Sequence, residues 1–382
     1  MRILSVVGTR PQIIKAAALQ PILRRDHVEI FVDTGQHYDE TMAGNFFGEL
    51  SLARPDHSLG IGGGSNDDQT GRMLIALEPL LRDVAPDAVL VYGDTNSTLA
   101  GALAAAKLGI PVAHVEAGLR SFDRGMPEEV NRVVADHLSR WLFVPTAAAV
   151  ANLAAEGIAT GVVEVGDLML DLAARVSAEV RDPAVLSEIG ARLGLGLRPG
   201  GYLLATVHRA ENRAPEAMAA WTRLLGAVAS ADRPVILPLH PGTRTALDAA
   251  GIALPRNVVQ IEPQGYATAL ALQLHAAAVL TDSGGVQRES AWLGVPCLVL
   301  RATTEWVETV GGPGSSAVLV GLDSDAAVRE LAARAPGARS AELAVARATA
   351  LHLAGPGAAE RISAVLAAND IAAGAAAGRH RS

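Results

Sequence analysis

The chain of 382 residues has little cysteine, few aromatic side chains and no long uninterrupted hydrophobic run. Its single cysteine, Cys297, excludes a disulfide framework and a metal site with several cysteine ligands. Because Cys297 lies in an apolar run, we expect a buried, inert thiol. Aromatic residues make up 3% of the chain although hydrophobic residues make up 50%, so the core must be built mainly from Ala, Val and Leu.

Positive charge is also scarce, and the formal net charge is −8. This balance argues against a nucleic acid or an anionic membrane as a partner, and any anionic ligand needs local basic residues or helix N-termini. No hydrophobic run reaches membrane-spanning length. Residues 1–7 follow a strand pattern that Arg10 and Pro11 end too early for a signal peptide. We therefore expect a cytoplasmic protein.

Two cofactor signatures are missing as well. The ten histidines show no metal-ligand spacing with carboxylates, so we expect no metal site. A G-x-G-x-x-G fingerprint is absent after the first predicted strand, which does not support a tightly held NAD. The chemistry must then come from the side chains themselves.

Short apolar runs alternate with helical periods along most of the chain. The predicted strands cover residues 3–7, 28–32, 88–92, 108–113, 162–165, 202–207, 235–239, 258–261, 279–282 and 298–301. The predicted helices cover residues 13–23, 38–50, 70–81, 98–107, 135–155 with an apolar break at 141–144, and a segment that begins at 168. This alternation predicts α/β domains with parallel sheets covered on both faces, in which ligands bind at the carboxyl ends of the strands.

Length predicts two domains. A Gly- and Pro-rich stretch at 183–201 marks the boundary, so we expect Rossmann-like domains at 1–180 and 181–357. A helix over 358–370 would cross back to the first domain, and the Ala/Gly-rich and then basic tail at 371–382 would be disordered. Two similar halves with facing ligand loops suggest a GT-B architecture, with both parallel sheets facing a central cleft.

The densest charge lies in residues 114–132, which hold four carboxylates and three arginines directly after a predicted strand. Charge beside a core strand is costly unless it is paired or used. A solvated loop with ion pairs is one interpretation, and Gly118, Pro127 and the strand-end position raise a functional loop as the other.

Two more loops of the first half fall at strand ends. One carries Arg10, with Lys15 about one helical turn farther on, and the other carries Asp94. Asp94 could cap the following helix, although Thr95 or Ser97 could do so equally well.

The second half repeats this arrangement. His208 and Arg209 follow one strand, and Ser283, Gly284 and Gly285 follow another and open a helix. Free backbone N–H groups and a positive helix end would bind phosphate there, although a single Gly-Gly pair also fits an ordinary tight turn. Glu289, on the first turns of that helix, suits a ribose hydroxyl.

Five motifs in order resemble the non-hydrolysing UDP-N-acetylglucosamine 2-epimerases. They span residues 8–11, 93–95, 116–132, 206–209 and 282–289, and the resemblance extends to about residue 362. Each motif alone is weak. Together they imply a GT-B fold, a homodimer, no redox cofactor, and interconversion of UDP-N-acetylglucosamine (UDP-GlcNAc) with UDP-N-acetylmannosamine (UDP-ManNAc).

The chemistry can be argued separately. The C2 proton of a 2-acetamido sugar has no adjacent carbonyl, so either a neighbouring carbon is oxidised or expulsion of UDP from C1 acidifies that proton. Without a nicotinamide fingerprint, the second route through a glycal is favoured, and it needs acid/base groups on two faces of the sugar. By the resemblance, the catalytic residues are Asp94, Glu116, Glu128 and His208. The residues that would bind UDP and its sugar are Arg10, Lys15, Arg209, Gln264, Ser283, Gly284, Gly285, Glu289 and Arg301. Which carboxylate takes which proton stays open.

The sequence departs from this pattern at several positions. Gln12 stands where many members have Glu, Ala269 stands where some have an aromatic residue, and Trp306 replaces an arginine in the run 304–308. Trp306 variants also occur in relatives that act on UDP-diacetamido-uronates. The substrate therefore stays open between UDP-GlcNAc and such a uronate, and a hydrolysing 2-epimerase or a GT-B glycosyltransferase is a further alternative. Of the run that forms an effector pocket in some bacterial members, only Gln36 and His37 match, so we expect hyperbolic kinetics.

Overall fold

The computed structural model describes residues 1–36, 50, 52–304, 306–310, 315–334 and 357–379. The chain divides into two compact units. Unit 1 comprises Met1–Leu172 and Leu353–Ser382, and unit 2 comprises Ala173–His352. The division lies within α7 (Leu168–Val180), and the boundary expected from the sequence lies at the end of the same helix.

Unit 1 is built on a seven-stranded parallel sheet with the strand order β3-β2-β1-β4-β5-β6-β7. Its strands are β1 (Arg2–Val7), β2 (Val28–Asp33), β3 (His57–Ser58), β4 (Ala88–Tyr92), β5 (Val112–Val115), β6 (Trp141–Val144) and β7 (Val162–Glu164). The order runs outward from β1 in one direction and from β4 in the other. The loops after β1 and β4 therefore diverge, which is where open α/β sheets bind their ligands.

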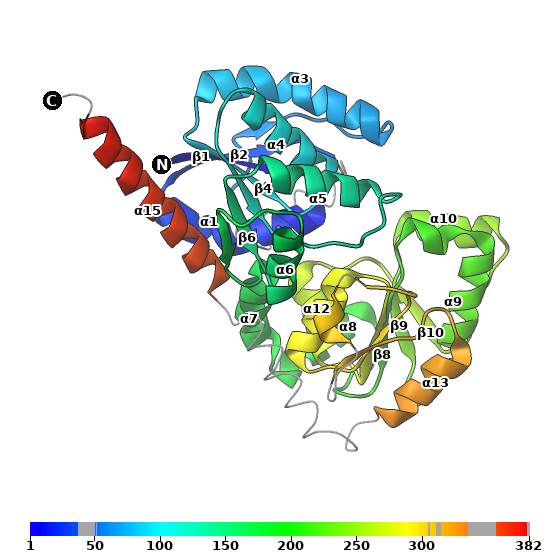
Figure 1. The fold of residues 1–382 in the computed structure, drawn as a ribbon. Helices are drawn as coiled ribbons and strands as arrows, with labels where there is room; N and C mark the ends of the chain where they lie inside the picture. The colour runs from blue at the N-terminus through cyan, green and yellow to red at the C-terminus, as the bar shows by residue number, and fades with distance from the viewer. Residues whose placement is uncertain (37–49, 51, 305, 311–314, 335–356, 380–382) are drawn as a thin grey trace. The chain divides into compact units, whose positions relative to one another are not determined.

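Helices cover both faces of this sheet (Figure 1). In unit 1 they are α1 (Arg10–Asp26), α3 (Asn66–Val84), α4 (Asn96–Lys107), α5 (Pro127–Leu138), α6 (Ala147–Ala155), α7 and α15 (Ala358–Arg379). Figure 1 shows α3, α4 and α5 together on one face and α1 with α15 on the other. The first three bury Met73, Leu77 and Ala135 against strand residues such as Val6 and Val91.

The last helix belongs to unit 1. The carboxylate of Asp171 accepts hydrogen bonds from the backbone N–H groups of Gly357 (2.6 Å) and Ala359 (2.9 Å), which caps the start of α15. The hydroxyl of Ser363 donates to Asp26 at the end of α1 (3.0 Å). The helix runs to Arg379, into the segment for which composition predicts disorder. Alanine is the best helix former, so its abundance there favours a helix.

One local prediction is wrong. The stretch 135–155 is not one broken helix, because the strand β6 (Trp141–Val144) separates α5 from α6 and pairs with β5 and β7. Four consecutive buried apolar residues fit either structure, and the neighbouring strands decide between them. The helix predicted over 38–50 falls almost entirely outside the described residues.

Unit 2 is built on a six-stranded parallel sheet with the order β10-β9-β8-β11-β12-β13. Its strands are β8 (Leu203–Thr206), β9 (Val235–Pro238), β10 (Val258–Ile261), β11 (Ala278–Thr281), β12 (Cys297–Val299) and β13 (Ala317–Leu319). Its helices after α7 are α8 (Pro183–Leu193), α9 (Pro215–Val228), α10 (Pro241–Ala249), α11 (Tyr266–Leu274), α12 (Gly284–Leu293) and α13 (Ser324–Ala333), with 3₁₀ turns η1 (Ala210–Arg213) and η2 (Val307–Thr309).

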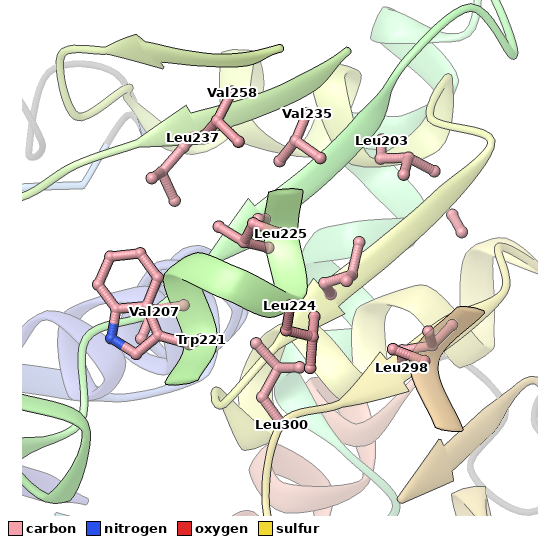
Figure 2. Packing of buried hydrophobic residues seen from close by; sticks show 14 of the residues in the cluster. Leu203, Val207, Trp221, Leu224, Leu225, Val235, Leu237, Val258, Leu298 and Leu300 are labelled. Atoms are coloured by element: carbon pink, nitrogen blue, oxygen red, sulfur yellow. The ribbon is translucent and has the colours of Figure 1, made fainter. Parts of the chain in front are cut away.

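The core of unit 2 lies between α9 and the sheet. Figure 2 shows Trp221 of α9 beside Val207 and Leu224 near Leu300, and all four belong to one buried cluster with strand residues such as Val235. The indole N–H of Trp221 donates to the carbonyl of Asn212 (3.1 Å), so the one polar atom of this large side chain is satisfied. Among the described residues, no helix has the length and apolar character needed to cross a membrane.

Candidate active site

Three loops of unit 1 carry candidate residues at one edge of its sheet. Arg10 follows β1, Asp94 follows β4 and Glu116 follows β5, and these three strands are neighbours in the order β1-β4-β5. The carboxyl ends of parallel strands meet at the same edge, so the fold itself brings the loops together.

The buried side chain of Gln12 joins the first two loops. Its carbonyl oxygen accepts from the N–H of Gly8 (2.8 Å) at the start of α1. Its amide nitrogen donates to the carbonyl of Tyr92 (2.7 Å) at the end of β4 and to the hydroxyl of Thr98 (3.0 Å). This second role needs a donor, which a glutamate at the same position lacks when ionised.

Lys15 and Glu116 form an ion pair at this edge. The ammonium nitrogen lies 2.9 Å from Oε1 of Glu116, and the side chains are 6% and 12% exposed. Glu116 has a backbone φ of +67°, a region that non-glycine residues rarely adopt. The fold therefore places this carboxylate on a constrained backbone and beside a buried cation.

Asp94 pairs with Arg132 of α5. The cap of α4 is Thr95 and not Asp94, so the Asp94 side chain is available for this pairing. Arg132 also lies 2.7 Å from Glu129. Sequence reasoning did not single out Arg132, because the two residues of the Asp94 pair lie far apart in the chain.

Glu129 and Glu128, although adjacent, have different surroundings. Glu129 is buried and accepts from the backbone N–H groups of Ser121 (2.9 Å) and Phe122 (3.0 Å). Burial alone would raise the pKa of Glu129, but the hydrogen bonds from Ser121 and the charge of Arg132 hold it below its ordinary value. Glu128 is exposed on the first turn of α5 and makes no hydrogen bond or ion pair with the described residues. Glu129 therefore shapes the loop, while Glu128 is free to meet a ligand.

In unit 2, Asp282 holds His208. These residues follow β11 and β8, which are neighbours in the sheet. Oδ1 of Asp282 lies 3.0 Å from Nδ1 of His208, and the side chains are 0% and 55% exposed, respectively. Asp282 also accepts from the backbone N–H of Arg209 (3.0 Å) and from the side chain of Asn212 (2.7 Å).

These contacts decide the charge of Asp282. Burial would raise the pKa of its carboxyl, but the hydrogen bond and charge of His208, with the donors on Arg209 and Asn212, hold that pKa below its ordinary value. An ionised Asp282 orients the imidazole by accepting from Nδ1, which leaves Nε2 exposed. We did not include Asp282 among the candidate site residues from the sequence. The sequence does carry a signal for Asp282, because this residue stands between a predicted buried strand and the Ser-Gly-Gly loop.

The start of α12 presents backbone donors. Ser283 is the N-cap, and its hydroxyl accepts from the N–H of Val286 (3.4 Å). Among the described residues, none supplies an acceptor to the N–H groups of Gly284 and Gly285. Farther along the helix, the buried Glu289 accepts from the phenol of Tyr266 (3.0 Å).

The other predicted ligand residues of unit 2 lie on its loops. Nε of Arg209 donates to the carbonyl of Asp282 (3.0 Å), and the side-chain amide of Gln264 donates to the carbonyl of Glu262 (2.7 Å). Arg301 is half-buried and lies just beyond β12. In the same loop Trp306 is buried, and the guanidinium carbon of Arg288 lies 3.7 Å from its ring centroid, as in a cation–π contact.

Cys297 is buried in β12, and burial raises the pKa of its thiol to about 12. The expectation of a buried thiol is therefore confirmed. Over the part of the chain that the structure describes, no three His, Cys, Asp or Glu side chains come together as ligands for a metal ion.

Comparison with known proteins shows which family this chain resembles. A family model described as UDP-N-acetylglucosamine 2-epimerase matches residues 22–367. A UDP-N-acetylglucosamine 2-epimerase homolog of Methanococcus maripaludis is 48% identical over 316 residues, which cover 81% of this chain and 86% of the relative. The UDP-2,3-diacetamido-2,3-dideoxy-D-glucuronate 2-epimerase of Pseudomonas aeruginosa is 44% identical over 331 residues, which cover 85% of this chain and 90% of the relative.

Solved structures agree with these matches. The UDP-GlcNAc 2-epimerase of Methanocaldococcus jannaschii, crystallised with UDP-GlcNAc and UDP, superimposes with a TM-score of 0.83 at 36% identity. The match covers 96% of this chain and 99% of that one. The GT-B fold class and the family resemblance are thereby confirmed, because the two parallel-sheet units and most of the chain match together. The protein belongs to the UDP-N-acetylglucosamine 2-epimerase family, whose members are isomerases.

Proposed function

We propose that this protein interconverts UDP-GlcNAc and UDP-ManNAc by eliminating UDP to a glycal and then adding UDP back. The main observation in support is the set of carboxylates at the carboxyl edge of the sheet of unit 1. Asp94 and Glu116 are each paired with a cation, and Glu128 is exposed on the first turn of α5. A reaction that removes a proton from one face of C2 and returns it on the other needs several such groups.

Unit 2 supplies the groups that suit the departing UDP. We propose that the N–H groups of Gly284 and Gly285, which follow the N-cap Ser283, bind the diphosphate at the positive end of α12. His208, held by Asp282, stabilises the charge that develops on the leaving phosphate. Glu289 and Arg209 contact the nucleotide, and Arg301 and Gln264 complete its binding. In unit 1, Arg10 contributes positive charge for the sugar phosphate, whereas Lys15 holds Glu116.

The reaction is tested by incubating the protein with UDP-GlcNAc in deuterium oxide without added NAD. We expect UDP-ManNAc and UDP-GlcNAc that carry deuterium at C2, detected by NMR and mass spectrometry. Epimerisation that retains all protium at C2 would refute elimination through a glycal. Release of free N-acetylmannosamine would instead identify a hydrolysing epimerase, and transfer of the sugar to an acceptor would identify a glycosyltransferase.

Variants assign the roles. We expect His208→Ala to lower turnover on the order of 100-fold, as the loss of other electrostatic stabilisers does. Glu128→Gln should also lower turnover. Glu78→Gln is its control, because Glu78 is 56% exposed and, within the described ranges, pairs with Arg82 of α3 alone. Wild-type turnover in both His208→Ala and Glu128→Gln would remove these residues from the mechanism.

One relative and the residue Trp306 favour a different substrate, a UDP-diacetamido-uronate. The Pseudomonas aeruginosa relative at 44% identity is named as an epimerase of a UDP-diacetamido-uronate. Trp306, which stacks on Arg288, stands where the commonest pattern of the family has an arginine. The ratio of kcat/KM for the two UDP-sugars, measured in parallel, decides between them. A ratio above about 100 in favour of the uronate would overturn UDP-GlcNAc as the substrate.

We further propose that the protein works in the cytoplasm, where its UDP-sugar is available, and as a homodimer. The resemblance to the family supports both statements. Light scattering of the purified chain tests the second, since a mass of one chain at assay concentration would contradict it.

A further inference from the structure

A cluster of charged side chains, three of them buried and the fourth at the surface, is bonded to the loops of Asp94 and Glu116. Its centre is Asp136 of α5. Oδ1 of Asp136 lies 2.7 Å from Nδ1 of His114, and both side chains are 0% exposed. Oδ2 accepts from Nη1 of Arg120 at 2.7 Å. Arg120 also pairs with Glu156 at 2.7 Å. None of these four side chains belongs to the proposed acid–base or phosphate-binding groups.

The cluster is bonded to the backbone of both loops. Nε2 of His114 lies 2.6 Å from the carbonyl oxygen of Gly93, the residue before Asp94. Oδ2 of Asp136 accepts from the N–H of Gly118 (3.1 Å), two residues after Glu116. Gly118 has a φ of +78°, and a Cβ there would lie 2.6 Å from the carbonyl oxygen of Ala149. The cluster thus holds the backbone just before Asp94 and just after Glu116.

The hydrogen bonds determine the protonation of His114. A carbonyl oxygen only accepts, so Nε2 must donate to Gly93. Oδ2 of Asp136 accepts from the guanidinium of Arg120 and from Gly118, and this neighbouring cation favours the ionised carboxylate, so Oδ1 accepts and Nδ1 donates as well. Either neutral tautomer would place a nitrogen lone pair 2.6 or 2.7 Å from an oxygen lone pair.

We infer that His114 is an imidazolium ion in the folded protein, and that it is a positioning residue that holds the loops of Asp94 and Glu116 in register. The catalytic part of this inference rests on the proposed function.

The charges of the cluster support the inference. Burial of a charge is costly unless it is paired. As a cation, His114 is paired with Asp136, and Arg120 is balanced by Asp136 and by Glu156, which lies at the surface. Burial would raise the pKa of Asp136, but the charges and hydrogen bonds of His114 and Arg120 hold it below its ordinary value.

The protonation state can be measured without an activity assay. The wild-type protein, labelled with ¹⁵N in histidine, is examined by NMR at about pH 8, where ordinary histidines are neutral. His114 is assigned through bonds from the backbone, so that no variant has to fold. We expect both of its ring nitrogens at imidazolium shifts. A neutral tautomer at His114 would overturn the inference, whatever the protein catalyses.

Two variants then separate the two hydrogen bonds. The amide nitrogen of His114→Asn reaches the place of Nδ1 and keeps the bond to Asp136, and that of His114→Gln reaches the place of Nε2 and keeps the bond to Gly93. We expect each to lower kcat by about 10- to 100-fold, as displaced catalytic groups do, with KM for the UDP-sugar within about threefold of wild type. His137→Gln is the control, because His137 is 50% exposed and lies at the rim of the cluster, 3.4 Å from Glu156.

Kinetics are compared only for variants whose circular dichroism and melting curves show a fully folded protein at the assay temperature. Wild-type kcat in both folded variants would refute the positioning role. If both variants fail to fold, the NMR result on the wild-type protein decides. A wild-type protein that does not epimerise UDP-sugars would count against the proposed function and would leave the imidazolium at His114 to be judged by NMR alone.

Discussion

Nζ of Lys15 lies 2.9 Å from Oε1 of Glu116, and neither side chain is more than 12% exposed. From the sequence, Lys15 was a candidate substrate-binding residue. In the folded chain its ammonium group faces a candidate catalytic carboxylate. Because a poorly exposed charge is unfavourable unless it is paired, this ion pair stabilises the side chain of Glu116 at its position.

Lys15→Met tests this relationship. We expect turnover to fall about 100-fold because Glu116 loses this ion pair and shifts in position, while UDP affinity stays within about threefold of wild type. Steady-state kinetics and calorimetry with UDP measure the two effects. Lys107→Met, at the exposed end of α4, is the matched control. Weak UDP binding with normal turnover would instead assign Lys15 to the phosphate.

Asp282→Asn should disturb His208 without removing it. The amide keeps the shape of the carboxylate but loses the charge that orients the imidazole and stabilises its protonated form. We expect turnover to fall about 10- to 100-fold with the fold intact. Asp248→Asn, on the exposed surface of α10, should leave turnover unchanged. Equal rates for Asp282→Asn and wild type would show that His208 needs no orienting carboxylate.

The stability of the protein should fall steeply in acid. The pKa values of Asp136 and Asp282 lie below their ordinary value in the folded chain. The unfolded chain therefore binds their protons first as pH falls, starting at about pH 4. Their contribution to the free energy of unfolding is complete above that pH and is lost as pH falls through the lowered values. Urea unfolding at a series of pH values measures this loss, and Asp282→Asn should flatten the curve. Parallel curves would contradict this assignment.

Gln12→Glu should destabilise unit 1. The amide nitrogen of Gln12 donates to the carbonyl of Tyr92 at 2.7 Å, and a carboxylate would place an oxygen there instead. Loss of this buried hydrogen bond should cost about 1–3 kcal/mol. Thermal and urea unfolding measure the change, with Gln12→Met as the variant that removes both donor and acceptor. A Gln12→Glu variant as stable as wild type would show that the site takes up a proton or rearranges.

Kinetics in UDP-GlcNAc should be hyperbolic. The run that forms an effector pocket in some family members is reduced here to Gln36 and His37, and residues 37–49 lie outside the described part of the chain. Gln36 itself accepts from the hydroxyl of Ser97 (2.7 Å). Each donor lost to a charged ligand should cost about 1.5–3 kcal/mol, which weakens a second nucleotide site strongly. Sigmoidal forward rates, with a lag in the reverse reaction that trace UDP-GlcNAc abolishes, would prove this expectation wrong.

The sequence by itself determined the α/β class and the places of the candidate loops. Apolar runs such as 88–92 and 279–282 are strands at those positions, with one-residue differences at the ends. The residues directly after them, Asp94 and Ser283 among them, lie at carboxyl edges of parallel sheets. These positions could be predicted because local periodicity and chain direction can both be read from short stretches of sequence.

Only the tertiary structure decided which partners these residues have. Arg132 pairs with Asp94 across 38 positions of sequence, and Asp282 reaches the backbone N–H of His208 across 74. The elements that pack side by side decide whether Lys15 contacts a phosphate or Glu116. They also decide whether residues 141–144 form a helix or a strand. Contacts between residues that lie this far apart in the sequence leave no local signal, because they are selected by the burial and charge balance of the whole unit.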